Sequence, residues 1–154
     1  MSPKLRDQLA VERQLLRRLL EEYRELVTAS RTRAPTPIER SALAAMLHAF
    51  YNGVENIFKR ISTECDGGIP GGNAAHRDLL DAMARAGPGR SQVISEDLRN
   101  LLDHYLDFRH LFRHAYTFDL QWEKMAGAVW RCDDTFRQLE EELDRFLSSL
   151  GNEA

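Results

Sequence analysis

The residues between Asp107 and Asp119 form the densest group of side chains that could bind phosphate and transfer protons. The nine positions from Phe108 to Tyr116 contain two arginines, two histidines and a tyrosine: Arg109, His110, Arg113, His114 and Tyr116. A guanidinium is permanently charged and presents a planar fork that matches phosphate oxygens. Imidazoles gain and lose protons near neutral pH. This combination could stabilise negative charge on a phosphate while a proton moves to or from a neighbouring oxygen.

Apolar side chains recur every three or four positions along most of the chain, which is the pattern of amphipathic helices. Stop signals separate these stretches, namely the glycine-rich run 66–72 and the Gly87-Pro88 pair. A further break is expected at 117–119, immediately after the group of arginines and histidines. We therefore expect four long helices and one short one, over residues 5–27, 37–65, 73–86, 95–116 and 122–150.

Side chains that can cap helices stand at the expected starts. Thr36, Pro37 and Glu39 have the spacing of a capping box, with proline at the first helical position. The expected N-caps of the later helices are Asn73, Ser95 and Asp119.

The alternating pattern of a β-strand is not found in the sequence. Long helices joined by loops of modest length favour antiparallel neighbours. The sequence therefore predicts an all-α fold, an antiparallel up-and-down bundle of four long helices plus one short helix. A length of 154 residues fits one domain, so we expect residues 1–154 to form a single helical domain.

The composition is that of a soluble globular protein, with 43% hydrophobic and 29% charged residues. A net charge of -3 argues against a nucleic-acid-binding coat over the whole surface, so RNA would have to meet a local basic patch. Cys65 and Cys132 lack the spacing of a thiolate metal site. Signal-like and membrane-length apolar runs are also missing. We expect a cytoplasmic protein that does not contact the membrane.

Arg109 interrupts the apolar face of the fourth expected helix. At about 100° per residue it falls between Leu102, Tyr105 and Phe112. An unpaired buried charge costs several kcal/mol, so this arginine must have a way to be neutralised or solvated. It could meet a carboxylate from another helix, open into a cavity or an interface, or bind an anionic ligand.

Arg109 and His114 cannot share one substrate on a straight helix. Five positions separate their side chains by about 140° around the axis. They can converge if the helix ends or bends near His114, or if two copies of the chain face each other. Tyr116 lies seven residues from Arg109 and would share its face if the helix continued.

The opposite face of the same helix offers a metal-binding alternative. His110 and His114 are four residues apart, and Asp107 lies three residues before His110. Two imidazole nitrogens and a carboxylate could bind a divalent ion. The same pattern also occurs on ordinary solvated helix faces.

The Arg109-x4-His114-x-Tyr116 motif resembles the signature of the HEPN superfamily, and specifically of the HepT-like toxins of bacterial toxin–antitoxin pairs. The segment 51–61 (YNGVENIFKRI) is similar to the second helix of that family, and the expected bundle covers nearly the full chain. The family commonly has asparagine or aspartate after the motif arginine, whereas this chain has His110.

The resemblance implies a metal-independent endoribonuclease toxin of a type VII-like toxin–antitoxin pair, which needs no cofactor. Two protomers of a homodimer would bring their motifs together on an RNA substrate. Arg109 and His114 would then be the catalytic residues. The supporting RNA contacts would be His110, Arg113, Asn52 and Glu55, although Asn52 and Glu55 could instead be polar residues on the outer side of the second helix.

The resemblance also implies a partner, a small nucleotidyltransferase antitoxin that transfers AMP to Tyr116 and so neutralises the toxin. An alternative is a non-catalytic helical binding module that docks a nucleotidyltransferase or binds a nucleotide. A third possibility is a bundle that serves only for dimerisation, with Arg109 paired to an acid.

Overall fold

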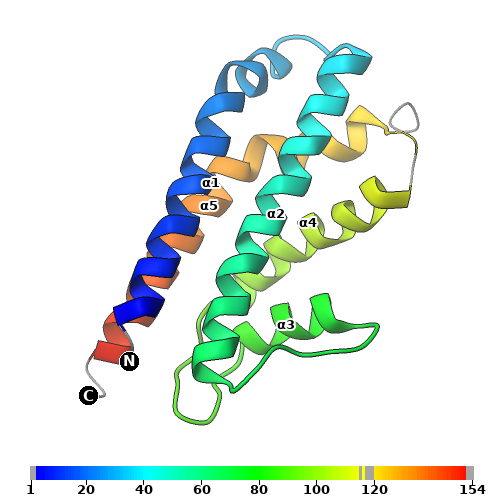
Figure 1. The fold of residues 1–154 in the computed structure, drawn as a ribbon. Helices are drawn as coiled ribbons and strands as arrows, with labels where there is room; N and C mark the ends of the chain where they lie inside the picture. The colour runs from blue at the N-terminus through cyan, green and yellow to red at the C-terminus, as the bar shows by residue number, and fades with distance from the viewer. Residues whose placement is uncertain (1–2, 115, 117–119, 152–154) are drawn as a thin grey trace.

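The computed structural model describes residues 3–114, 116 and 120–151, without the side chains of Pro3, Arg113 and His114. Within these residues the chain forms five α-helices and no strand (Figure 1). The predicted all-α class with four long helices and one short helix is confirmed. The helices are α1 (Pro3–Ser30), α2 (Pro37–Cys65), α3 (Ala75–Met83), α4 (Glu96–His114) and α5 (Trp122–Gly151).

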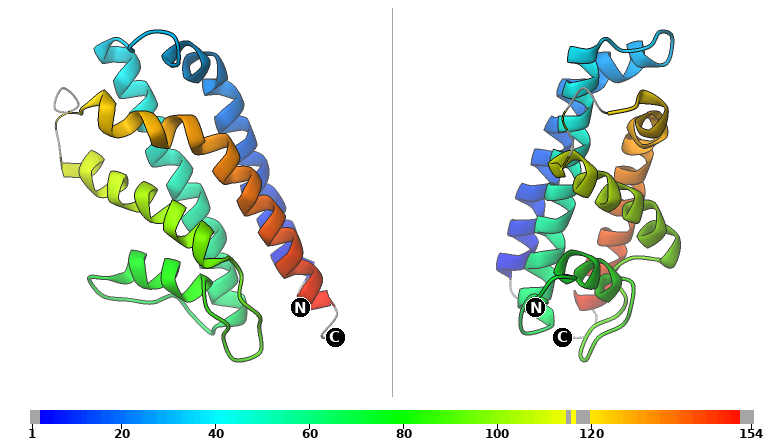
Figure 2. Two further views of the ribbon diagram at one scale, coloured as in Figure 1. Left: turned by 180° about the vertical axis from the view of Figure 1, so that it is seen from behind. Right: turned by 90° about the vertical axis from the view of Figure 1, so that its right-hand side faces the viewer.

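The long helices follow one another up and down, as predicted. Helix α2 runs back along α1, and α5 returns beside α1 toward the end where α1 begins (Figures 1 and 2). Helix α4 crosses the outer side of α2, and the short α3 lies between the last turns of α2 and the start of α4. None of the described helices is long and apolar enough to span a bilayer.

The predicted start of α2 is confirmed in detail. The Glu39 backbone N–H donates to Thr36 Oγ1 at 3.1 Å, and the Thr36 N–H donates to Glu39 Oε1 at 2.9 Å. This reciprocal pair is the capping box, and Pro37 occupies the first turn. The start of α4 is also as expected, because Ser95 Oγ accepts from the Leu98 N–H at 3.1 Å.

Both predicted ends of α3 are wrong. The helix begins at Ala75, and Ala74, which precedes it, provides no side-chain cap, so Asn73 is not the N-cap. Gly72 has φ of +96° and its carbonyl accepts from the Ala75 N–H, so a turn occupies the positions that the cap would need. The helix ends at Met83, before the Gly87-Pro88 signal. The predicted break at 117–119 and the Asp119 cap lie outside the described residues.

A buried loop anchor explains the early end of α3. The Arg90 side chain is only 2% exposed and binds both carboxylate oxygens of Asp66, at 2.7 and 2.9 Å. It also donates to the carbonyls of Ala82, Arg85 and Ser91. Arg90 therefore holds the segment after α3 against the C-terminal end of α2, and this contact fixes the position of α3.

The core holds α4 against α2 and α5 through aromatic contacts. Phe50 of α2 meets Tyr105 of α4 edge-on with ring centroids 5.1 Å apart, and Phe136 of α5 at 6.4 Å. The Tyr105 hydroxyl donates to the Ala128 carbonyl of α5 at 2.7 Å. These contacts fix the rotation of α4 about its axis, and with it the direction of the side chains on its other face.

Candidate functional site

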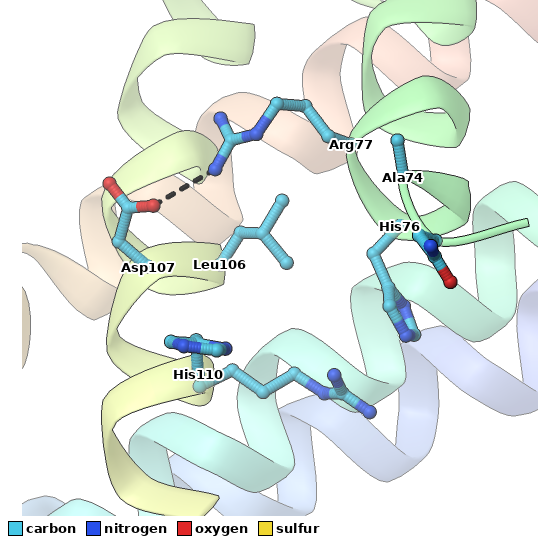
Figure 3. Close-up of a pocket in the computed structure, with 8 residues that line it drawn as sticks. Ala74, His76, Arg77, Leu106, Asp107 and His110 are labelled. Atoms are coloured by element: carbon cyan, nitrogen blue, oxygen red, sulfur yellow. Dashed lines mark hydrogen bonds and ion pairs between the residues drawn. The ribbon is translucent and has the colours of Figure 1, made fainter. Parts of the chain in front are cut away.

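A cavity of about 650 Å³ lies between α3 and α4. Figure 3 shows His76 and Arg77 entering it from α3, and Leu106, Asp107 and His110 from α4. The cavity is lined by two arginines, two histidines and one aspartate; of the two guanidiniums only that of Arg77 pairs with carboxylates among the described residues, so Arg109 gives the wall its positive charge. Its lining residues are Asn73, Ala74, His76, Arg77, Leu106, Asp107, Arg109 and His110.

Arg109 projects from the half-buried side of α4 into this cavity, as its place in the apolar stripe suggested. Its Nε–H donates to Asn52 Oδ1 on α2 at 3.1 Å. Among the described residues, Arg109 takes part in no ion pair with a carboxylate. The sequence left open a carboxylate partner, a cavity or interface, or an anionic ligand for Arg109. The structure places Arg109 at a cavity, where its hydrogen bond goes to the neutral amide of Asn52.

Glu55 is buried on the inner side of the site. It is 3% exposed, and His76 Nδ1 lies 2.8 Å and 2.9 Å from its two carboxylate oxygens. Lys59 Nζ lies 3.5 Å from Oε1. Glu55 therefore does not lie on a solvated outer side of α2. Asn52 accepts a hydrogen bond from Arg109.

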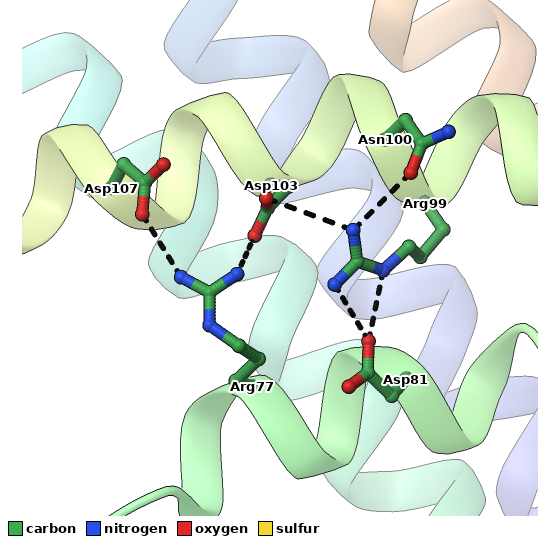
Figure 4. A network of polar contacts seen from close by, with 6 residues as sticks. All are labelled: Arg77, Asp81, Arg99, Asn100, Asp103 and Asp107. Atoms are coloured by element: carbon green, nitrogen blue, oxygen red, sulfur yellow. Dashed lines mark hydrogen bonds and ion pairs between the residues drawn. The ribbon is translucent and has the colours of Figure 1, made fainter.

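Arg77 is paired in a different way from Arg109. Figure 4 shows its guanidinium between the carboxylates of Asp103 and Asp107 on α4; the contact with Asp107 is 2.9 Å long. Arg99 extends the network to Asp81 of α3 at 2.8 Å, and this hydrogen bond raises the pKa of Arg99. The network clamps α3 onto α4 and neutralises the positive charge of Arg77.

Tyr51 lies in the field of the same charges. Its side chain is fully buried, and its hydroxyl is one of the buried polar atoms for which the described part of the chain offers no hydrogen-bond partner. Burial raises the pKa of Tyr51, and the carboxylates of Glu55 and Asp103 raise it further. The positive charges of Arg77 and Arg109 lower the same pKa by less. Tyr51 thus stays neutral at physiological pH and does not act as a general base.

The metal-binding alternative does not assemble from the described residues. Asp107 binds Arg77, and His110 lines the cavity from an exposed position. The side chain of His114 lies outside the described residues. Within the described residues, no group of three or more histidine, cysteine or acidic side chains is arranged to hold a metal ion.

The remaining motif residues lie at the end of α4. The structure describes α4 up to His114, close to the position where a helix end or bend was one of the two expected ways for Arg109 and His114 to converge. The side chain of Arg113, like that of His114, lies outside the described residues. Tyr116 is 73% exposed.

Sequence reasoning missed the contribution of α3. His76 and Arg77 are followed by Asp78 and then by Leu79 and Leu80, the apolar residues that marked this short helix. An adjacent histidine and arginine in an otherwise ordinary segment are a weak signal. What places them in the site is their partners: His76 contacts Glu55, 21 positions away, and Arg77 contacts Asp103, 26 positions away.

The fold and the cavity define an all-helical protein with a cationic site between its third and fourth helices. Residues 42–150 match the model of a family described as HepT-like protein, and this range includes all of α3 and α4. The chain therefore belongs to the HepT-like family of the HEPN superfamily, which confirms the motif resemblance. No curated protein and no solved structure shows significant similarity to the chain.

Proposed function

We propose that residues 1–154 form one HepT-like domain that acts as a metal-independent endoribonuclease toxin in the cytoplasm. Membership of the HepT-like family supports the toxin class. The observation that carries the proposal is the position of Arg109, whose guanidinium enters a cationic cavity without a carboxylate partner among the described residues. An RNA phosphate supplies the missing negative charge.

The proposed chemistry uses the ribose hydroxyl next to the scissile phosphate. Arg109 donates to the non-bridging phosphate oxygens and stabilises the charge that gathers on them during cleavage. His114 transfers a proton, either from the 2′-hydroxyl or to the leaving oxygen. DNA lacks the 2′-hydroxyl and resists cleavage. His110, Arg113 and Asn52 support the site, the last by holding Arg109.

A second protomer completes the proposed site. On a straight helix, five positions separate Arg109 and His114 by about 140°, so we expect the two side chains of one chain to point apart. In a homodimer that pairs the ends of α4, Arg109 and His114 meet across the interface on one phosphate.

Regulation is proposed to act through Tyr116. The residue is 73% exposed, which leaves it within reach of another enzyme. A small nucleotidyltransferase antitoxin transfers AMP to its hydroxyl, as in a type VII-like pair. The added phosphate brings negative charge to the cationic site and excludes RNA.

Substitution of Arg109 and His114 tests the proposal. We expect Arg109→Ala and His114→Ala each to lower RNA cleavage about 100-fold or more, the effect of losing one charge-stabilising or proton-transfer group. Cleavage is measured with purified protein in EDTA, and toxicity by growth on induction. Arg18→Ala is the matched control, because Arg18 is a 75% exposed arginine on α1.

Three results would contradict the proposal. RNA cleavage by the Arg109→Ala, His114→Ala double variant would show that the site is elsewhere. Tight nucleotide binding or docking of a nucleotidyltransferase, without cleavage by the unaltered chain, would select the non-catalytic binding module. Activity that EDTA abolishes and a divalent ion restores would favour a metal site.

A further inference from the structure

The cavity contains a second histidine that the motif does not include. We propose that His76, oriented by Glu55, is the general base that removes the proton from the ribose 2′-hydroxyl. This assignment rests on the proposed ribonuclease function and adds a catalytic residue from α3 to it.

The contact with Glu55 determines which nitrogen of His76 can react. An ionised carboxylate only accepts hydrogen bonds, so Nδ1, at 2.8 and 2.9 Å from its two oxygens, carries a hydrogen. Nε2 is then the nitrogen left for the cavity that His76 lines. A carboxylate that fixes the tautomer and ring orientation of a histidine is the arrangement of a histidine base in nucleophilic catalysis.

Charged groups surround the pair formed by Glu55 and His76. Glu55 has a permanent counter-charge in Lys59, whose Nζ lies 3.5 Å from Oε1. It therefore does not depend on a charged His76 to balance its buried carboxylate. Arg109 lines the same cavity without a carboxylate partner among the described residues, whereas the charge of Arg77 is balanced by Asp103 and Asp107. Once His76 takes a proton, Glu55 stabilises the imidazolium.

The reaction itself requires two proton-transfer groups. His76 Nε2 takes the 2′-hydroxyl proton while the 2′-oxygen forms a bond to phosphorus. The bond from phosphorus to the 5′-oxygen breaks, and His114 gives that oxygen a proton. The products are a 2′,3′-cyclic phosphate end and a 5′-hydroxyl end, with one proton removed and one delivered. Because attack and departure occur on opposite sides of the phosphorus, one histidine cannot easily serve both.

The same contact could be purely structural, since it ties α3 to α2. His76→Asn separates the two roles. The asparagine amide nitrogen is the same number of bonds from Cα as Nδ1, so it can still donate to Glu55. Asparagine offers nothing at the position of Nε2. A structural role predicts an active variant, and a base predicts a stable, inactive one.

The experiment compares single-turnover cleavage of two RNAs by the full-length protein. One is an oligoribonucleotide with a bond that the unaltered chain cleaves, and the other carries sulfur in place of the 5′-oxygen at that bond. A sulfur leaving group departs without a proton. We expect His76→Asn to slow both RNAs about 100-fold or more. Sulfur should restore cleavage by His114→Ala but not by His76→Asn.

Controls separate folding from chemistry. The unfolding temperature of His76→Asn should lie within about 4 °C of the unaltered chain, equivalent to about 1 kcal/mol. His104→Asn is the matched control, because His104 is an exposed histidine of α4 outside the cavity lining. It should cleave both RNAs at the unaltered rate.

Each contrary outcome overturns a different statement. Normal cleavage by His76→Asn, with Arg109→Ala inactive, overturns the role of His76 and leaves the proposed function intact. Restoration of His76→Asn by sulfur makes His76 the acid and overturns its assignment as the base. Failure of the unaltered chain to cleave any RNA overturns the proposed function and the assignment together.

Discussion

Arg90, in the loop after α3, and Arg109, on α4, are two arginines at least partly shielded from solvent that have different partners. Arg90 makes five hydrogen bonds, two to Asp66 and three to backbone carbonyls. Among the described residues Arg109 makes one, from Nε to the neutral Asn52, and its head group lines a cavity. Arg90 has no capacity left for a ligand, whereas Arg109 retains its charge for one. Arg90 is therefore a structural anchor and Arg109 a candidate binding group, although both side chains are at least partly shielded from solvent.

The largest expected effect on stability is that of removing the anchor. Arg90→Ala leaves the Asp66 carboxylate and three carbonyls without their donor, and losing one partner of a buried ion pair typically costs about 3–5 kcal/mol. Urea denaturation followed by circular dichroism measures the free energy of unfolding. Arg109→Ala is the control, with an expected loss of about 1 kcal/mol for one hydrogen bond to a neutral acceptor. Equal losses for the two variants would contradict the comparison.

A smaller effect is expected from making Arg109 resemble Arg90. Asn52→Asp keeps the shape of the side chain and places a carboxylate against the guanidinium. We expect stability at neutral pH to rise by up to about 1 kcal/mol, because the pair is only partly shielded from solvent. RNA cleavage should fall, since the new carboxylate competes with the phosphate. Unfolding and cleavage are measured on the same preparation; increased cleavage would show that Arg109 does not bind the phosphate.

The smallest effect is expected at the ion pair between Arg33 and Glu39 on the protein surface. The hydrogen bond from Arg33 lowers the pKa of Glu39 to about 2, helped by the Thr36 backbone N–H. A lowered folded-state pKa stabilises the fold above the unfolded value of 4.5, and this contribution is lost as pH falls toward 2. NMR titration of the Glu39 carboxyl in Arg33→Ala should show its pKa moving upward. An unchanged pKa would mean that the pair does not form in solution.

Arg109 and His110, the cavity-lining residues that the sequence singled out as site candidates, could be predicted because their signals are local. Arg109 was conspicuous because it interrupts a run of apolar residues on the same helix. His76 gave no comparable signal, because nothing in its own segment indicates that Glu55 will be buried beside it. Asn73 was a misleading signal, because the turn at Gly72 takes the place of the predicted cap.

The sequence by itself determined the helical class, the order of the long helices and the capping box at Thr36, because each depends on residues within a few positions of one another. It also identified Arg109 as a charge that needs an explanation. Only the tertiary structure decided that its partner is Asn52, 57 positions away, and that Asp103 and Asp107 go to Arg77 instead. Helix packing brings such residues together, and helical periodicity specifies which face is buried without specifying which side chain it meets.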